Sequence, residues 1–124
     1  MIVGVKMGIG VDIIENKRFA KFKITHDHLN SLYTKSELSF LQSKKYEEKY
    51  FAQLFAIKEA VSKALGYGFS QGVSPLDIEV EIIKNSPKIT LHGRAKEVFI
   101  EKGYSSIDVS VTSNDISLAI CIIK

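Results

Sequence analysis

The chain has 124 residues and a mass of 13.9 kDa, with 45% apolar and 25% charged residues, which excludes a disordered chain and predicts one domain spanning residues 1–124. No apolar run reaches the ~20 residues that a membrane span needs, and no short basic segment followed by an apolar run opens the chain. A net charge of +3 is too small to indicate nucleic-acid binding by itself. The single cysteine, Cys121, cannot form an internal disulfide, so we expect a cytoplasmic protein.

The first half of the chain predicts one strand followed by helices. β-Branched residues and glycines at 7–15 favour a strand that leads into a helical stretch over 16–22. Thr34 and Glu37 have the spacing of a capping box, which predicts a short helix through Leu41. Apolar residues then recur at helical intervals over 47–65 and stop at a glycine, so this segment is the longest predicted helix.

The second half predicts two hairpins separated by a helix. Alternating polar and apolar residues at 77–83 favour a strand, and residues 85–87 a turn into a partner strand over 88–91. Residues 93–102 follow as a helix, and two final strands are expected at 107–112 and 116–123. The order β-α-α-α-β-β-α-β-β indicates an α+β fold with an antiparallel sheet.

One face of the long predicted helix carries polar residues that are candidates for a functional site. Glu59, Ser62, Lys63 and Gly66 lie at i, i+3, i+4 and i+7 and therefore share a face. One interpretation is a surface Glu–Lys pair that stabilises the helix by a few tenths of a kcal/mol. The other is a binding site, since alanines beside the pair leave space and glycines after it admit a ligand to the backbone.

Asp12 is the second candidate, because a carboxylate within an apolar strand is costly if it faces the core without a partner. It could face solvent on an edge strand. Alternatively, Asp12 and Glu59 could meet in space and hold a hard divalent cation such as Mg²⁺, leaving most of its shell to water and substrate phosphate.

Several segments, in order, resemble one enzyme family. Residues 8–15 (GIGVDIIE) with Arg18, and residues 55–66 (FAIKEAVSKALG), are closely similar to the two signatures of the holo-[acyl-carrier-protein] synthases, the small bacterial 4′-phosphopantetheinyl transferases. Three further segments also match: residues 32–38 (LYTKSEL), 77–80 (DIEV) and 109–112 (VSVT). The resemblance extends from Met7 to the C-terminus.

The resemblance implies a Mg²⁺-dependent transfer of phosphopantetheine from coenzyme A to a serine of apo acyl carrier protein, in fatty acid biosynthesis, with release of adenosine 3′,5′-bisphosphate. Asp12 and Glu59 match the family's metal ligands, and Lys63 its lysine beside the diphosphate; Glu59 and Lys63 are the catalytic candidates. The base that accepts the serine proton stays open among Glu59, neutral Lys63 and a metal-bound water. The expected coenzyme-binding residues are Lys58, Ser62, Lys63, Gly66, Asn85 and Pro87, although Asn85 could equally belong to an ordinary hairpin turn.

The resemblance also implies a carrier-protein surface, an oligomeric state and a role for the first six residues. Arg18 and Lys21 belong to a basic cluster that is either a solvated face or, as the family favours, the surface for the acidic helix of the carrier protein. The family implies a homotrimer with active sites shared between neighbouring chains. Residues 1–6 precede the usual start of the family, so we expect them to be an extension.

Two departures from the family concern coenzyme affinity. Leu54 and Ser113 stand where the family usually has arginine and histidine, so weaker coenzyme A binding is expected unless another residue compensates. The rival interpretation is a non-catalytic module that binds carrier protein and has lost the coenzyme. The presence of Asp12, Glu59 and Lys63 argues against it.

Overall fold

The computed structural model describes residues 6–20 and 26–124. The N-terminal half comprises β1 (Gly8–Glu15), the 3₁₀ helix η1 (Asn16–Phe19), α1 (His26–Leu32), α2 (Lys35–Ser43) and α3 (Glu48–Leu65). The C-terminal half comprises the 3₁₀ helix η3 (Pro75–Asp77), β2 (Ile78–Ile83), β3 (Ser86–Leu91), α4 (Gly93–Glu101), β4 (Ile107–Ser113) and β5 (Ile116–Ile123). The predicted α+β fold, the order of its strands and the helices α2, α3 and α4 are confirmed.

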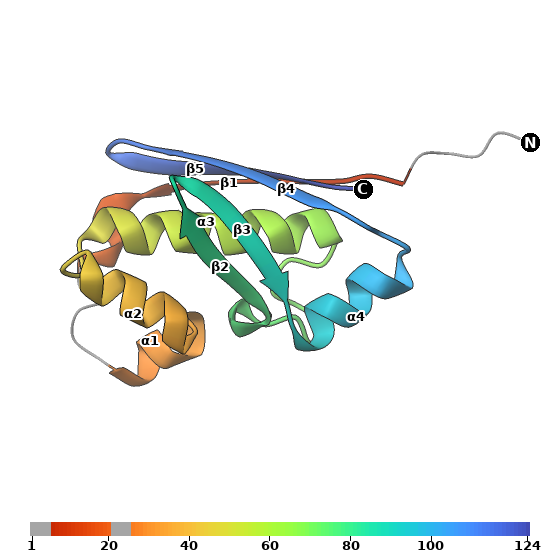
Figure 1. The fold of residues 1–124 in the computed structure, drawn as a ribbon, viewed down its shortest axis with the longest axis horizontal. Coiled ribbons are helices and arrows are strands. Elements are labelled where there is room, and N and C mark those ends of the chain that lie inside the picture. The colour runs from red at the N-terminus through yellow and green to blue at the C-terminus, as the bar shows by residue number, and fades with distance from the viewer. Residues whose placement is uncertain (1–5, 21–25) are drawn as a thin grey trace, which may run out of the picture.

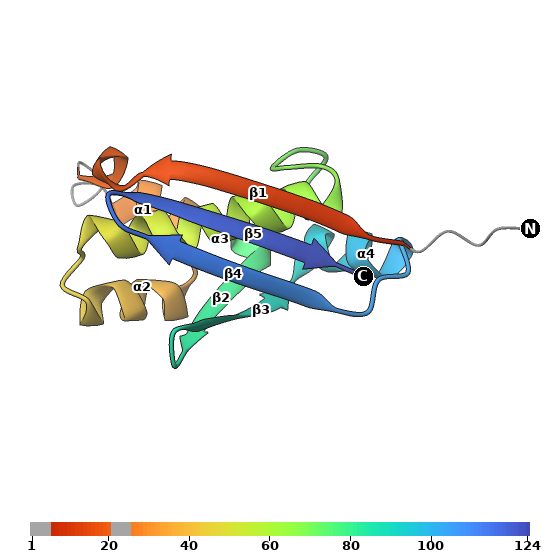
Figure 2. The same cartoon turned by 90° about the horizontal axis from the view of Figure 1, so that it is seen from above.

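The strands form two antiparallel sheets. The larger has the order β1-β5-β4, so β5 pairs with both neighbours and β1 is an edge strand; β2 and β3 form a separate hairpin. The long helix α3 runs beneath the three-stranded sheet, with α1 and α2 near one end and α4 near the other (Figure 1). Seen from above, no helix formed by residues 6–20 and 26–124 covers the opposite face of this sheet (Figure 2). No helix in the described part of the chain is long and apolar enough to cross a membrane.

The core lies between α3 and the inner face of the sheet. The inward residues of β5 are fully buried: Ser117, Ala119, Cys121 and Ile123. Burial raises the pKa of the Cys121 thiol to about 12, so this cysteine is an unreactive core residue, as expected from its apolar neighbours.

Glycines allow β1 to lie directly on α3. A Cβ at Gly10 would lie 1.8 Å from the carbonyl oxygen of Ala60, and one at Gly8 would lie 2.1 Å from that of Ala64. Only glycine fits at these two positions, because the obstructing atoms belong to the helix backbone and cannot rotate away. These contacts fix which residues of α3 face the next inward residue of β1, Asp12.

We therefore expect Gly10→Ala to be strongly destabilising. The added methyl group forces β1 and α3 apart, and overpacking of this kind costs about 3 kcal/mol at its upper end. Gly68→Ala is the matched control, because a Cβ there meets open space and costs only the left-handed backbone strain of about 1 kcal/mol. Urea denaturation of both variants measures the difference; equal losses would show that the helix and strand can separate freely.

Three local predictions need correction. Only Asn16–Phe19 of the predicted helix over 16–22 is seen as helical, a single 3₁₀ turn, while residues 21–25 lie outside the described part. Helix α1 was not predicted, because its seven residues are too few to establish an apolar period. The predicted turn at 85–87 lies one residue earlier: Lys84 and Asn85 both have positive φ and form a two-residue hairpin turn, so Pro87 belongs to β3.

Candidate active site

Asp12, Glu59 and Lys63 come together where β1 crosses α3. Asp12 follows Gly8 and Gly10 on the inward face of β1, and its side chain is only 15% exposed. The Nζ of Lys63 lies 3.0 Å from Oδ1 of Asp12 and 3.1 Å from the carbonyl oxygen of Val11. Asp12 therefore faces the helix although β1 is an edge strand, and Lys63 pairs across elements rather than only along its own helix.

The two carboxylates influence each other electrostatically. Burial, and secondarily the negative charge of Asp12, raise the pKa of Glu59, whereas Lys63 acts in the opposite direction. Two neighbouring negative charges repel each other unless a cation offsets them, and Lys63 supplies one positive charge. The arrangement brings together the two carboxylates that the sequence suggested as metal ligands.

This donor set suits a hard divalent cation. Carboxylate oxygens are the protein ligands that Mg²⁺ prefers, and two of them leave most of an octahedral shell to water and to substrate phosphate. Within the described residues, no group of three or more His, Cys, Asp and Glu side chains could hold a metal. If a cation binds at this crossing, Asp12 and Glu59 are the side chains that would hold it, with positions left open for an anionic substrate.

Ser62 and Gly66 lie on the same stretch of α3 in mainly structural contacts. Ser62 is buried and its hydroxyl donates to the carbonyl oxygen of Glu59 at 2.7 Å. Gly66 ends the helix with φ +101, as expected from the sequence, and its N–H donates to the carbonyl oxygen of Lys63. Both residues hold the backbone around Glu59 and Lys63.

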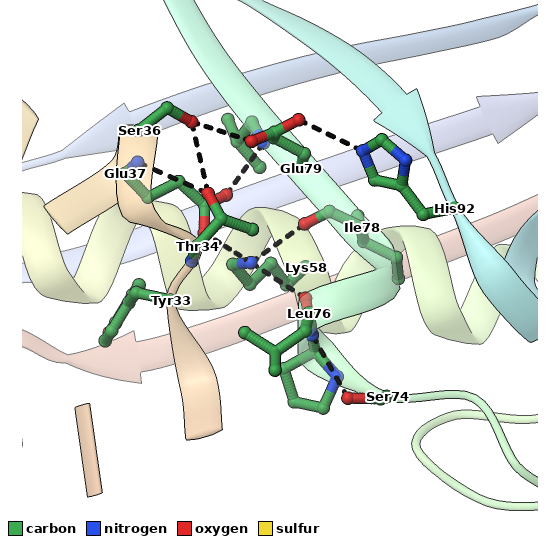
Figure 3. Close-up of polar contacts among 12 residues, drawn as sticks. Tyr33, Thr34, Ser36, Glu37, Lys58, Ser74, Leu76, Ile78, Glu79 and His92 are labelled. Atoms are coloured by element: carbon green, nitrogen blue, oxygen red, sulfur yellow. Dashed lines mark hydrogen bonds and ion pairs between the residues drawn. The ribbon is translucent and has the colours of Figure 1, made fainter. Parts of the chain in front are cut away.

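Lys58 does not fit its predicted contact with coenzyme. Its side chain is fully buried, and its Nζ lies 2.6 Å from Oε1 of Glu37 and 2.8 Å from the carbonyl oxygens of Pro75 and Ile78 (Figure 3). An ammonium has three hydrogens, so these partners use all of them. Burial lowers the pKa of Lys58 and Glu37 opposes that shift. The buried pairing, which the sequence pattern did not indicate, replaces the coenzyme interpretation.

The hairpin that carries Asn85 borders a basic cavity. A cavity of about 370 Å³ is lined by residues of α2, α3, the β2–β3 hairpin and β4: Phe40, Lys44, Lys49, Tyr50, Gln53, Ile82, Lys84, Asn85 and Val111. Pro87 is not among them. The sequence pattern did not indicate this group of lysines, because Lys84 is remote from Lys44 and Lys49 along the chain.

The remaining predicted residues lie apart from these contacts. Arg18 is exposed on η1, directly after the strand that carries Asp12. Lys21, the other residue predicted to bind carrier protein, lies outside the described residues. Exposure of Arg18 is compatible with a docking role.

The two departures from the family pattern have local partners in this fold. Leu54 is 1% exposed and packs in the core. The hydroxyl groups of Ser113 and Ser117 are 2.9 Å apart, and Ser117 donates to Oδ1 of Asn16, so these side chains join the β4–β5 turn to η1. Each residue therefore has a structural contact at its position.

Comparison with known proteins identifies the family of this chain. The family model described as the 4′-phosphopantetheinyl transferase superfamily matches residues 8–121. The holo-[acyl-carrier-protein] synthase of Geobacter sp. (strain M21) is 37% identical over 119 residues, covering 94% of each chain. Among solved structures, the Neisseria meningitidis synthase aligns with a TM-score of 0.82 and 29% identity over 94% of this chain and 97% of that one. The Helicobacter pylori synthase, solved in complex with coenzyme A, aligns with a TM-score of 0.80 and 30% identity over 94% and 99%. The chain therefore belongs to the holo-[acyl-carrier-protein] synthase family of 4′-phosphopantetheinyl transferases.

Proposed function

We propose that this protein transfers the 4′-phosphopantetheine arm of coenzyme A to a serine of apo acyl carrier protein, using Mg²⁺ held by Asp12 and Glu59. The observation that carries the proposal is the meeting of Asp12, Glu59 and Lys63 at the crossing of β1 and α3. The match of the family model to residues 8–121 supports treating this stretch as one transferase domain. Carrier-protein modification serves fatty acid biosynthesis in the cytoplasm.

The chemistry follows from charge at the diphosphate. The serine hydroxyl gives its proton to a base, for which Glu59, neutral Lys63 and water are the candidates, and its oxygen forms a bond to the β-phosphorus. The bond from that phosphorus to the bridging oxygen breaks, so adenosine 3′,5′-bisphosphate leaves with the electron pair. Mg²⁺ held by Asp12 and Glu59 would supply Lewis-acid stabilisation of the phosphate oxygens. Lys63, half-exposed beside Asp12, can neutralise negative charge that develops there. Asp12 and Glu59 hold their positions because β1 and α3 are locked together at Gly8 and Gly10.

The basic cavity is our candidate place for the one phosphate of coenzyme A outside the diphosphate, the 3′-phosphate of its ribose. Lys44, Lys49 and Lys84 gather there beside Asn85, and Tyr50 offers an aromatic ring. Lysine is a common phosphate ligand that acts as a point charge. These lysines would compensate for the arginine and histidine that the family usually has at positions 54 and 113.

The apolar residues exposed on the outer face of the larger sheet are our evidence for an interface between subunits of a homotrimer. Six apolar residues on its outer side are 37–61% exposed: Ile9, Val11, Ile13, Ile116, Leu118 and Ile120. On the paired strands β1 and β5, which lie side by side in Figure 2, Val11 is opposite Ile120 and Ile13 is opposite Leu118, so these exposed apolar residues adjoin on one face of the sheet. Continuous exposed apolar surfaces usually mark interfaces. Asp12 lies between two of these residues in the chain, which agrees with active sites near a subunit boundary.

Ile13→Glu should therefore disrupt the assembly. Burying an unpaired carboxylate in an apolar interface is strongly unfavourable, so we expect the variant to elute as a smaller species. Ile100→Glu is the matched control, because Ile100 is equally exposed, at 63% against 60%, but lies on α4. Size-exclusion chromatography with light scattering measures both masses; an unchanged mass for Ile13→Glu would exclude this face as the interface.

The activity itself is tested by mass spectrometry of the carrier protein. After incubation with coenzyme A, Mg²⁺ and apo acyl carrier protein, the carrier should gain the mass of one phosphopantetheine arm. A carrier that binds the protein but gains no mass would favour the non-catalytic module. Omission of Mg²⁺ should abolish the gain.

A further inference from the structure

The ammonium of Lys63 pairs with the Asp12 carboxylate, which a bound metal ion would also need as a ligand. It lies 3.0 Å from Oδ1 of Asp12, whose side chain is mostly buried, and it is anchored by the carbonyl oxygen of Val11 at 3.1 Å. It also offsets the charge of Glu59. Lys63 is thus the direct ion-pair partner of Asp12.

We propose that Lys63 competes with the divalent cation for Asp12, so that the lysine lowers metal affinity until an anionic substrate draws it away. This inference rests on the proposed function, because it takes Asp12 and Glu59 as the metal ligands. A dication approaching Asp12 meets a positive charge already paired with one carboxylate oxygen, and either the ion pair opens or the two cations repel each other.

Competition between Lys63 and the metal ion would couple metal binding to binding of the coenzyme diphosphate. Lys63 is 47% exposed, so its long side chain can leave Asp12 at little packing cost and turn to a nearby phosphate oxygen. An anion that attracts Lys63 would therefore strengthen metal binding, and by reciprocity the metal would free Lys63 for the anion. The same lysine would serve as a placeholder before substrate arrives and as a phosphate ligand afterwards.

The test measures binding of Mn²⁺ alone, without coenzyme or carrier protein, by the electron paramagnetic resonance signal of free Mn²⁺. Lys63→Met removes the charge and keeps an unbranched side chain, so the inference predicts tighter Mn²⁺ binding, on the order of 10-fold, as removal of a unit charge near a dication in a largely aqueous setting implies. Lys63→Arg keeps the charge and should stay close to wild type. Lys96→Met is the matched control, because it removes the same charge from an exposed position on α4.

The outcomes separate the inference from the proposed function. Mn²⁺ affinity that is equal or lower in Lys63→Met than in wild type would overturn the competition while leaving the metal site standing. Absence of binding in both wild type and Lys63→Met would overturn both. A gain of the same size in Lys96→Met would show that only net charge matters and would also overturn it. Circular dichroism verifies folding, and Lys63→Gln replaces Lys63→Met if the latter does not fold.

Discussion

Asp12→Ala and Glu59→Ala should each reduce the rate of phosphopantetheine transfer by on the order of 10²-fold or more, by analogy with the removal of other groups that stabilise a transition state. Each substitution removes one of the two carboxylates that interact electrostatically where β1 packs on α3. Mass spectrometry of the carrier protein over time, at saturating Mg²⁺, measures the rate.

The same substitutions should change stability little. The Asp12–Lys63 ion pair is partly exposed, and such pairs contribute about 1 kcal/mol or less. Asp12→Asn and Glu59→Gln keep the shape and remove only the charge, so they should lose activity almost as fully as the alanine variants. Near-wild-type rates in both charge-neutral variants would contradict the metal assignment.

The sequence predicted that Asp12 and Glu59 could meet, but it did not predict the packing contacts around them. Asp12 and Glu59 lie 47 positions apart, yet the strand and helix that carry them have strong local periods, and family resemblance paired their motifs. Periodicity alone left open whether Asp12 faces solvent. The deciding contacts are those of Gly8 and Gly10 with backbone atoms of α3, and such contacts depend on tertiary packing.

Prediction succeeded for local contacts and failed where a contact joins residues far apart in the sequence. The capping box at Thr34 and Glu37 was predicted correctly, since its hydrogen bonds involve residues close in sequence. The second role of Glu37, as the partner of Lys58, depends on residues 21 positions apart and left no pattern in the sequence. Lys58 lies next to Glu59 in the chain but on another face of α3, so its place in the motif did not indicate its buried contacts.

Lys58→Met should be among the most destabilising single substitutions in the protein. It leaves the carboxylate of Glu37 buried without its cation, although the backbone N–H groups of Thr34 and Val80 still donate to it. Breaking a buried ion pair on one side typically costs about 3–5 kcal/mol. The free energy of unfolding from urea denaturation measures the loss.

A double variant distinguishes this structural role from coenzyme binding. Adding Glu37→Gln to Lys58→Met removes the orphaned charge while keeping an acceptor for one backbone N–H, so the double variant should recover at least about 1 kcal/mol relative to Lys58→Met alone. Its KM for coenzyme A should match wild type, because the Lys58 ammonium is fully enclosed by Glu37, Pro75 and Ile78. A stable Lys58→Met variant with a raised KM would instead restore the coenzyme contact predicted from the sequence. The buried pair is thus expected to hold α2, α3 and the start of β2 together, while the chemistry stays with Asp12, Glu59 and Lys63.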